Sequence, residues 1–149
     1  MNGIPCPFCA IAAGEAPASI VADDGDMLAF MDLRQAVPGH VLVVPRRHAP
    51  DLCALTPDEA AAAMRMAQRV ALALQDEFHP AGFNVWQSNG LAAGQEVFHF
   101  HLHVQPRGAA DGLSRIYSGD VPEPVPTDRL DAWAQALRQR MHGRSHGDW

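Results

Sequence analysis

The sequence lacks any apolar run that approaches the roughly 18 residues of a membrane-spanning helix. Residues 1–5 have neither the basic start nor the apolar core of a secretory signal peptide. The chain has only three cysteines, an odd number that argues against the disulfide framework of a small secreted protein. We therefore expect a cytoplasmic protein that neither spans nor binds a membrane.

The sequence is also poor in positive charge. It has 17 Asp and Glu against 11 Lys and Arg, a net charge of −6 at pH 7. A general nucleic-acid-binding protein needs a basic stripe, so this balance argues against that class, although a local site for a small anion remains compatible with it. At 149 residues, 48% hydrophobic and 19% charged, the chain matches one globular domain with a buried core.

The apolar pattern predicts short strands around one long helix. Thr56, Pro57 and Glu59 supply a capping box and a first helical residue for a helix over 57–77. Apolar residues recur on one face of that helix at Ala63, Ala67, Val70, Leu74 and Phe78. We expect strands at 19–22, 27–31, 39–45, 83–87 and 97–106, and shorter helices at 10–13 and 128–141. This pattern predicts an α+β fold, an antiparallel meander with helices packed on one side.

Three histidines alternate with apolar residues in the last predicted strand. Side chains alternate across a strand, so His99, His101 and His103 would project from one face, roughly 6.5–7 Å apart. The residues between them, Phe100 and Leu102, would face the core with Val104. Two interpretations remain open at this point. The imidazoles hold one catalytic metal, or one imidazole is a nucleophile and its neighbours supply hydrogen bonds and protons.

A loop of small residues, 88–95, precedes the histidines. Exposed backbone N–H groups in such a loop can hold phosphate oxygens, and Gln95 adds a donor and an acceptor. A phosphate cradle beside three imidazoles suits phosphoryl or nucleotidyl transfer, which depends on positioning and charge stabilisation. The loop by itself is equally well read as a simple connector.

Two further features concern cysteine. Cys6 and Cys9 form a C-x-x-C pair, typical of metal-binding or redox-active sites in a reducing compartment. Cys53 stands alone and reads as a small core or surface residue.

The segment Gly94-Gln95-Glu96-Val97-Phe98-His99-Phe100-His101-Leu102-His103-Val104 resembles the signature of the histidine triad (HIT) family. Asp32, the segment 38–45 and His48 resemble the upstream strand of the same family. The resemblance covers roughly residues 6–107 and is closest to a bacterial zinc-containing branch similar to nucleoside phosphoramidases and dinucleoside polyphosphate hydrolases.

The resemblance implies the HIT-like fold. This fold has an antiparallel sheet of about five strands, a long helix, and shorter N- and C-terminal helices. Residues 1–149 would form a single domain, with its core at about 6–107 and a C-terminal extension over 108–149 that carries the helix at 128–141.

The resemblance also implies residue roles. His101 would attack phosphorus, His103 and His40 would line the phosphate site and manage protons, Gln95 would contact the phosphate or the leaving group, and Asp32 would take the ribose hydroxyls. The loop would contribute Ser88, Asn89, Gly94 and Glu96. An apolar slot for the base, or alternatively plain core, would consist of Phe8, Ile11, Phe30, Leu33 and Leu42. Ser88 departs from the asparagine often found there, which loosens one phosphate contact.

A structural zinc ion is implied on Cys6, Cys9, His48 and His99. A redox dithiol is the rival interpretation, but it leaves His48 unexplained. A closed Cys₂His₂ site has no open position for water, so this zinc would stabilise the fold, and no catalytic metal would be required. Because His99 is then a ligand, the three-histidine catalytic metal becomes the weaker interpretation.

The implied function is a nucleotide hydrolase that cleaves a nucleoside 5′-phosphoryl–X bond through a nucleotidyl-histidine intermediate and releases a nucleoside monophosphate. The substrate would be a phosphoramidate, an adenylated amine or a dinucleoside polyphosphate, with a purine base, adenosine first. The family also implies a C2 homodimer with the long helix and a strand at the interface. The alternatives are a nucleotidyltransferase of the same superfamily and a non-catalytic nucleotide- or zinc-binding interaction protein.

Overall fold

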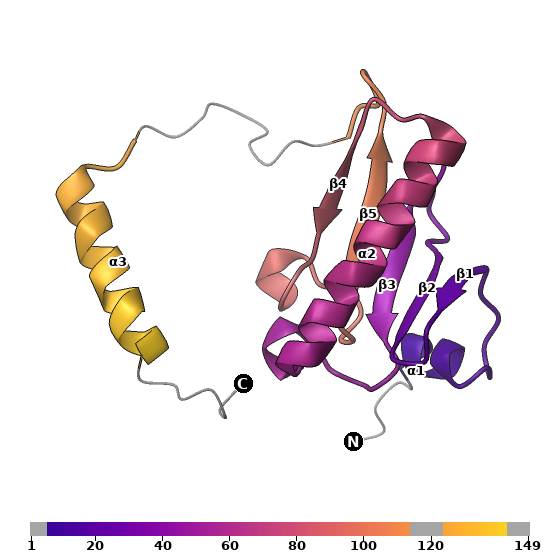
Figure 1. Cartoon of the computed structure of the whole chain (residues 1–149), viewed down its shortest axis with the longest axis horizontal. Helices are drawn as coiled ribbons and strands as arrows, with labels where there is room; N and C mark the ends of the chain where they lie inside the picture. The colour runs from indigo at the N-terminus through magenta and orange to yellow at the C-terminus, as the bar shows by residue number, and fades with distance from the viewer. Residues whose placement is uncertain (1–5, 114–123, 143–149) are drawn as a thin grey trace. The chain divides into compact units, whose positions relative to one another are not determined.

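A computed structural model of the chain describes residues 6–113 and 124–142 (Figure 1). The chain divides into two compact units, Met1–Asp111 and Gly112–Trp149. The second unit contains helix α3 (Thr127–His142), which matches the helix predicted in the C-terminal extension. The parts of that extension at 114–123 and 143–149 lie outside the described residues.

In the described part of the first unit the chain forms a five-stranded antiparallel sheet of order β1-β2-β3-β5-β4. The strands are β1 (Ile20–Asp23), β2 (Met27–Met31), β3 (Val41–Pro45), β4 (Gly82–Trp86) and β5 (Leu102–Arg107). The helices are α1 (Pro7–Ala12), α2 (Pro57–Phe78) and the 3₁₀ turns η1 (Leu52–Ala54) and η2 (Leu91–Ala93). The predicted α+β fold, with one long helix and shorter helices near both ends, is confirmed.

Helix α2 begins and ends at the residues that the sequence indicates as its termini. The Thr56 hydroxyl accepts from the Glu59 amide at 3.2 Å, and the Glu59 carboxylate accepts from the Thr56 amide at 2.8 Å. His79 ends the helix in a left-handed conformation, φ 44°, before Pro80. The predicted apolar face is buried except for Phe78, which lies in the last turn and is 46% exposed. Within the described residues, no helix combines the length and apolar character needed to cross a bilayer.

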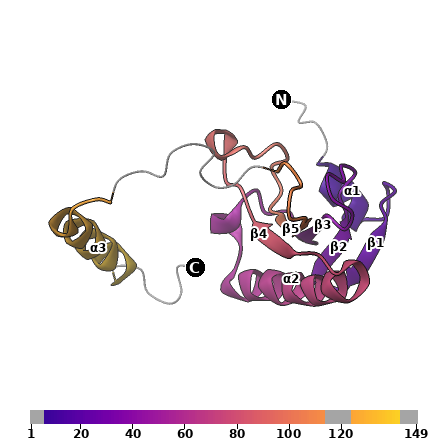
Figure 2. The same cartoon turned by 90° about the horizontal axis from the view of Figure 1, so that it is seen from above.

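Helices cover both faces of the sheet, so the prediction that they pack on one side is wrong. Strand residues alternate between two cores, because successive side chains point to opposite faces. Met27 and Ala29 pack toward α2, whereas Leu28 and Phe30 pack with Phe8 of α1. Figure 2 shows α2 and α1 on opposite sides of the strands. The face beneath α1 is the one that carries the histidine site.

Strand β5 begins later than predicted. The alternating histidines predict a strand over 97–106, but the ladder starts at Leu102. The amide of Phe100 donates instead to the carbonyl of Ala49, in the loop after β3, at 2.6 Å. Only His103 of the three histidines therefore lies in a strand, and the first two come from an irregular segment.

The loop after β3 is fixed to the start of α2 by an ion pair. The Arg47 guanidinium donates two hydrogen bonds to the Glu59 carboxylate, at 2.7 and 2.6 Å, and a third to the carbonyl of Ala54 at 2.8 Å. Arg47 thereby holds the pKa of Glu59 at about 2, well below its ordinary value. Glu59 thus serves the helix cap and the adjoining loop together.

This ion pair predicts a specific pH dependence of stability. A lowered folded-state pKa stabilises the fold above the unfolded value, near 4.3, and that contribution disappears as the pH falls toward 2. Glu59→Gln should therefore lower the free energy of unfolding by about 1 kcal/mol at pH 7, since solvent around Arg47 screens the pair. Urea unfolding at pH 7 and pH 3 measures the change.

At pH 3 the difference between the wild type and Glu59→Gln should shrink. Asp58→Asn removes an exposed carboxylate from the same helical turn and is the control, with a much smaller change between the two pH values. An equal loss at both pH values for Glu59→Gln would contradict the electrostatic explanation.

Candidate active site and metal centre

The three histidines of the motif lie together but have different surroundings. His99 is fully buried, His101 is 7% exposed, and His103 is partly buried in β5. The rings of His101 and His103 are 4.8 Å apart at an angle of 61°. Phe8 of α1 meets the rings of His99 and His101 edge-on, at 5.9 and 5.3 Å. Helix α1 therefore covers the first two histidines.

One hydrogen bond decides the protonation pattern of His101. Its Nδ1 lies 2.7 Å from the carbonyl oxygen of His99. A carbonyl can only accept, so Nδ1 carries a proton, and in the neutral ring the lone pair is then on Nε2. Among the described residues, none forms a hydrogen bond to Nε2 of His101. The ring thus presents an unshared electron pair to the site.

His40 and His103 form a second hydrogen-bonded pair. Nε2 of His40 lies 3.0 Å from Nδ1 of His103, while Nδ1 of His40 lies 3.3 Å from the carbonyl of Arg34 and 3.7 Å from Oδ2 of Asp32. The carbonyl requires a proton on Nδ1 of His40, so in a neutral His40 ring Nε2 accepts from Nδ1 of His103. Burial, together with His101 and His40, lowers the pKa of His103 to about 4.

A separate cluster contains both nearby cysteines. Potential ligand atoms of Cys6, Cys9, His48 and His99 all lie within 4.8 Å of one another. Sγ of Cys9 is 3.3 Å from Nδ1 of His48 and 3.5 Å from Nδ1 of His99, and Sγ of Cys6 is 3.4 Å from the same His99 atom. Tetrahedral zinc with ordinary Zn–S and Zn–N bonds puts sulfur and nitrogen about 3.5 Å apart. The donor set therefore fits zinc.

The hydrogen bonds around this cluster favour a cation. Nε2 of His99 donates to the carbonyl of Pro45 at 2.8 Å, which leaves the lone pair of Nδ1 directed at the two sulfurs. Burial lowers the pKa of His99 and keeps this imidazole neutral. Burial, followed by the adjacent Cys6, raises the pKa of the Cys9 thiol. A bound cation would relieve the cost of two neighbouring thiolates.

Comparisons with known proteins agree with this arrangement. A model of the HIT domain matches residues 13–110. Protein hit of Bacillus subtilis is 38% identical over 137 residues, 91% of this chain and 94% of that protein. The chain belongs to the histidine triad family. Family membership supports a nucleotide-binding function of the hydrolase type.

Solved structures of other family members are similar. A zinc-bound histidine triad family protein from Mycobacterium smegmatis is 35% identical, with a TM-score of 0.70, over 94% of this chain and 98% of that one. A histidine triad nucleotide-binding protein from Candida albicans is 26% identical, with a TM-score of 0.80, over 93% of this chain and 98% of that one.

Gln95 does not have the surroundings expected for a phosphate contact. Its side chain is 2% exposed; it accepts from the Gly90 amide at 2.7 Å and donates to the carbonyls of Pro50 and Val97 at 2.6 and 3.1 Å. The prediction of a contact by this side chain is not supported, because its amide is engaged by backbone groups. Gln95 instead holds the loop in shape.

The other loop residues of the predicted site differ in their contacts and exposure. Oδ1 of Asn89 accepts from the amide of Leu52 at 2.9 Å, so it ties the loop to η1. Ser88 is half-buried and Gly94 is left-handed, with φ 83°. The carboxylate of Glu96 is exposed and lies 3.5 Å from the guanidinium of Arg34.

Four of the five residues predicted to form an apolar slot, or alternatively plain core, lie together. Phe8, Phe30 and Leu42 are buried in one cluster, with Ile11 packed against it. Leu33 is not brought into this group; it is 99% exposed. The carboxylate of Asp32 accepts from the Arg34 amide at 2.7 Å in a turn that directs Leu33 outward.

Two residues at the site were not singled out by the sequence analysis. The Gln35 side chain accepts from the amides of Gly39 and His40 and donates to the carbonyls of Asp32 and His40, at 2.7 to 2.9 Å. It holds the turn between β2 and β3, and no local pattern signals this. Trp86 stacks on His103, and the alternation of strand β4 could have placed both on one face.

Gly39 explains how His40 reaches the site. A Cβ at Gly39, where φ is 102°, would lie 2.8 Å from Cδ2 of Leu74 in α2. Glycine therefore lets the chain press against α2 at the start of β3. The next side chain, His40, points to the opposite face, where it meets His103 and Trp86.

Proposed function

We propose that this protein cleaves nucleoside 5′-phosphoryl–X bonds, with His101 as the nucleophile. The observation that carries the proposal is the hydrogen bond from Nδ1 of His101 to the carbonyl of His99, which leaves a lone pair on Nε2. A neutral imidazole held in this tautomer can act as a nucleophile through Nε2. The substrate is a phosphoramidate, an adenylated amine or a dinucleoside polyphosphate, with adenosine as the preferred nucleoside.

In the first step Nε2 of His101 attacks the α-phosphorus. An N–P bond forms, the bond from phosphorus to the leaving group breaks, and the leaving group departs with the electron pair. The bound phosphate places negative charge beside His103, which raises the pKa of that ring. On substrate binding His103 therefore takes up a proton from solvent on Nε2 and delivers it to the leaving group, while Nε2 of His40 accepts the hydrogen bond from Nδ1 of His103.

In the second step water attacks the nucleotidyl-histidine. The O–P bond forms, the N–P bond breaks, and its electron pair returns to Nε2 of His101. His103 regains its proton from the water, so the catalyst ends as it began. The product is the nucleoside monophosphate. Asp32, beside His40, takes the ribose hydroxyls, and the cluster of Phe8, Phe30 and Leu42 borders the base.

Zinc is assigned to Cys6, Cys9, His48 and His99 in this proposal. The bound ion supplies a rigid crosslink between α1, the loop after β3 and the segment before β5. The Mycobacterium smegmatis relative is zinc-bound. His99 then has a double role, because its ring belongs to the metal site and its carbonyl orients His101.

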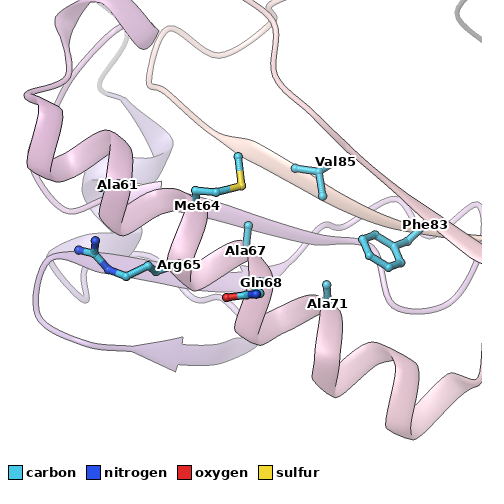
Figure 3. Close-up of a pocket in the computed structure, with 8 residues that line it drawn as sticks. All are labelled: Ala61, Met64, Arg65, Ala67, Gln68, Ala71, Phe83 and Val85. Atoms are coloured by element: carbon cyan, nitrogen blue, oxygen red, sulfur yellow. The ribbon is translucent and has the colours of Figure 1, made fainter.

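The protein is proposed to act as a homodimer through the face of the sheet opposite the histidines. An apolar groove lies between α2 and β4 (Figure 3). It is lined by Ala61, Met64, Arg65, Ala67, Gln68, Ala71, Phe83 and Val85. Strand β4 is also an edge of the sheet within the described residues, so its outer backbone groups can pair with a second copy.

The nucleophile is tested by His101→Asn. Asparagine keeps a polar side chain but cannot form the intermediate, so kcat should fall by at least about 10³-fold while nucleotide affinity changes little. Turnover is measured on adenosine phosphoramidate, adenylyl-lysine and diadenosine polyphosphates, with guanosine counterparts. Mass spectrometry of acid-labile adenylylated protein detects the intermediate.

His79→Asn is the matched control, since His79 ends α2 in a left-handed conformation that asparagine also adopts. Turnover retained by His101→Asn would exclude His101 as the nucleophile. Inorganic phosphate added to the reaction distinguishes hydrolysis, which yields only the monophosphate, from transfer, which yields a diphosphate.

Zinc binding is tested by Cys9→Ser. Plasma mass spectrometry should find about one zinc per chain in the wild type and much less in this variant, with a lower unfolding temperature. The control is Cys53→Ser, which alters an exposed thiol outside the cluster. Equal zinc content in all three proteins would refute the assignment.

Dimerisation is tested by Val85→Glu. A carboxylate in the groove opposes burial against a second copy, so sedimentation should change from a dimer to a monomer. Ile20→Glu places the same charge on the opposite edge strand, β1, and should leave the dimer intact. A dimer that survives Val85→Glu, or a monomeric wild type, would contradict this interface.

A further inference from the structure

Trp86 lies flat against a histidine of the site. The indole of Trp86 and the imidazole of His103 have centroids 4.3 Å apart and planes that differ by 2°. The same indole lies 5.5 Å from the ring of His40, at 31°. The two residues are direct cross-strand partners in the ladder between β4 and β5. The stack therefore follows from the register of the sheet.

The hydrogen bonds of His103 do not by themselves fix its orientation. Within the described residues, the ring makes one hydrogen bond, from Nδ1 to His40 at 3.0 Å. A single hydrogen bond leaves the imidazole ring of His103 free to tilt about that contact. His101 meets the ring at 61°, which leaves one flat face for Trp86. A parallel indole restricts the plane of the imidazole, and Trp has only two side-chain torsions to order.

The indole also limits water around the hydrogen-bonded pair. Trp86 is 39% exposed, so one side meets solvent while the other covers His103. A hydrogen bond in a drier environment is stronger. The groups that face His103 are His101, His40 and Asp32. The pair covered by the indole is His40 and His103, and His103 is the residue that transfers a proton in the proposed reaction.

We propose that Trp86 is a positioning residue that holds His103 in the plane in which Nδ1 meets His40 and Nε2 faces the phosphate. The proposal rests on the proposed function, since it assigns to His103 the proton transfers described above. Trp86 touches neither the reacting atoms nor the nucleotide in this scheme. It acts through His103.

Three substitutions of Trp86 distinguish the effect of a flat aromatic ring from the effect of apolar bulk alone. Trp86→Phe keeps an aromatic plane, Trp86→Leu keeps apolar cover without a plane, and Trp86→Ala keeps neither. We expect Trp86→Leu and Trp86→Ala to lower kcat about tenfold or more with KM within about threefold, because a misplaced catalytic group slows the chemical step. Trp86→Phe should retain kcat within about threefold.

A second readout does not depend on activity. Nitrogen-15 NMR of the imidazoles reports the tautomer and the pKa of His103 in the intact protein. The wild type and Trp86→Phe should show one fixed tautomer. Trp86→Leu and Trp86→Ala should show averaged nitrogen shifts, and Trp86→Ala a pKa that rises toward the ordinary value as water reaches the ring.

Ile20→Ala is the control, because it truncates a half-exposed apolar side chain on the opposite edge of the sheet. It should lower the unfolding temperature without changing the His103 signals. Unchanged His103 signals in Trp86→Leu and Trp86→Ala, or a Trp86→Phe variant as impaired as Trp86→Leu, would overturn the proposal. A wild type without turnover on any nucleotide refutes the proposed function instead, while the NMR comparison still decides the role of Trp86.

Discussion

The carbonyl of His99 accepts the hydrogen bond that orients His101, so the geometry of the site depends on where His99 is held. His99 is fully buried, and its ring lies between the sulfurs of Cys6 and Cys9 and the carbonyl of Pro45 at the end of β3. One residue therefore joins the N-terminal helix, the sheet and the proposed nucleophile. This connection lets the proposed metal site lie beside the proposed nucleophile, because the ring of His99 serves the metal site and its backbone carbonyl orients His101.

Burial controls the electrostatics of the site. Burial keeps His99 and His103 neutral near pH 7, and neutral imidazoles can accept protons or bind metal, whereas imidazolium can do neither. Neutral rings also avoid mutual repulsion, which matters when the rings of His101 and His103 are 4.8 Å apart. A phosphate that enters this group brings the negative charge that makes protonation of His103 favourable. Substrate binding thus favours the protonated His103 that the proposed reaction needs as its general acid.

The sequence predicted those parts of the fold that local rules control. Three such parts are the capping box at Thr56 and Glu59, the periodic apolar face of α2, and the β-branched run of β3. Each is determined by a few neighbouring residues. The late start of β5 could not be predicted in this way, since the amide of Phe100 bonds to a loop about fifty residues earlier. The surroundings of Gln95 could not be predicted for the same reason, because a long-range hydrogen bond to Pro50 engages its amide. The residues of the proposed metal site could be predicted only through the family resemblance, because C-x-x-C alone does not indicate its partner ligands.

Strand β4 links the two proposals that lie furthest from the nucleophile. Side chains alternate along it, so Phe83 and Val85 face the groove beside α2, and Trp86 faces the histidines. An edge strand has neighbours on one side only, and its position is correspondingly easy to shift. Pairing with a second copy would hold β4 from its outer side and would steady the indole that rests on His103. In such a dimer, assembly and the proposed proton transfer would be physically coupled through the backbone of β4, Gly82–Trp86.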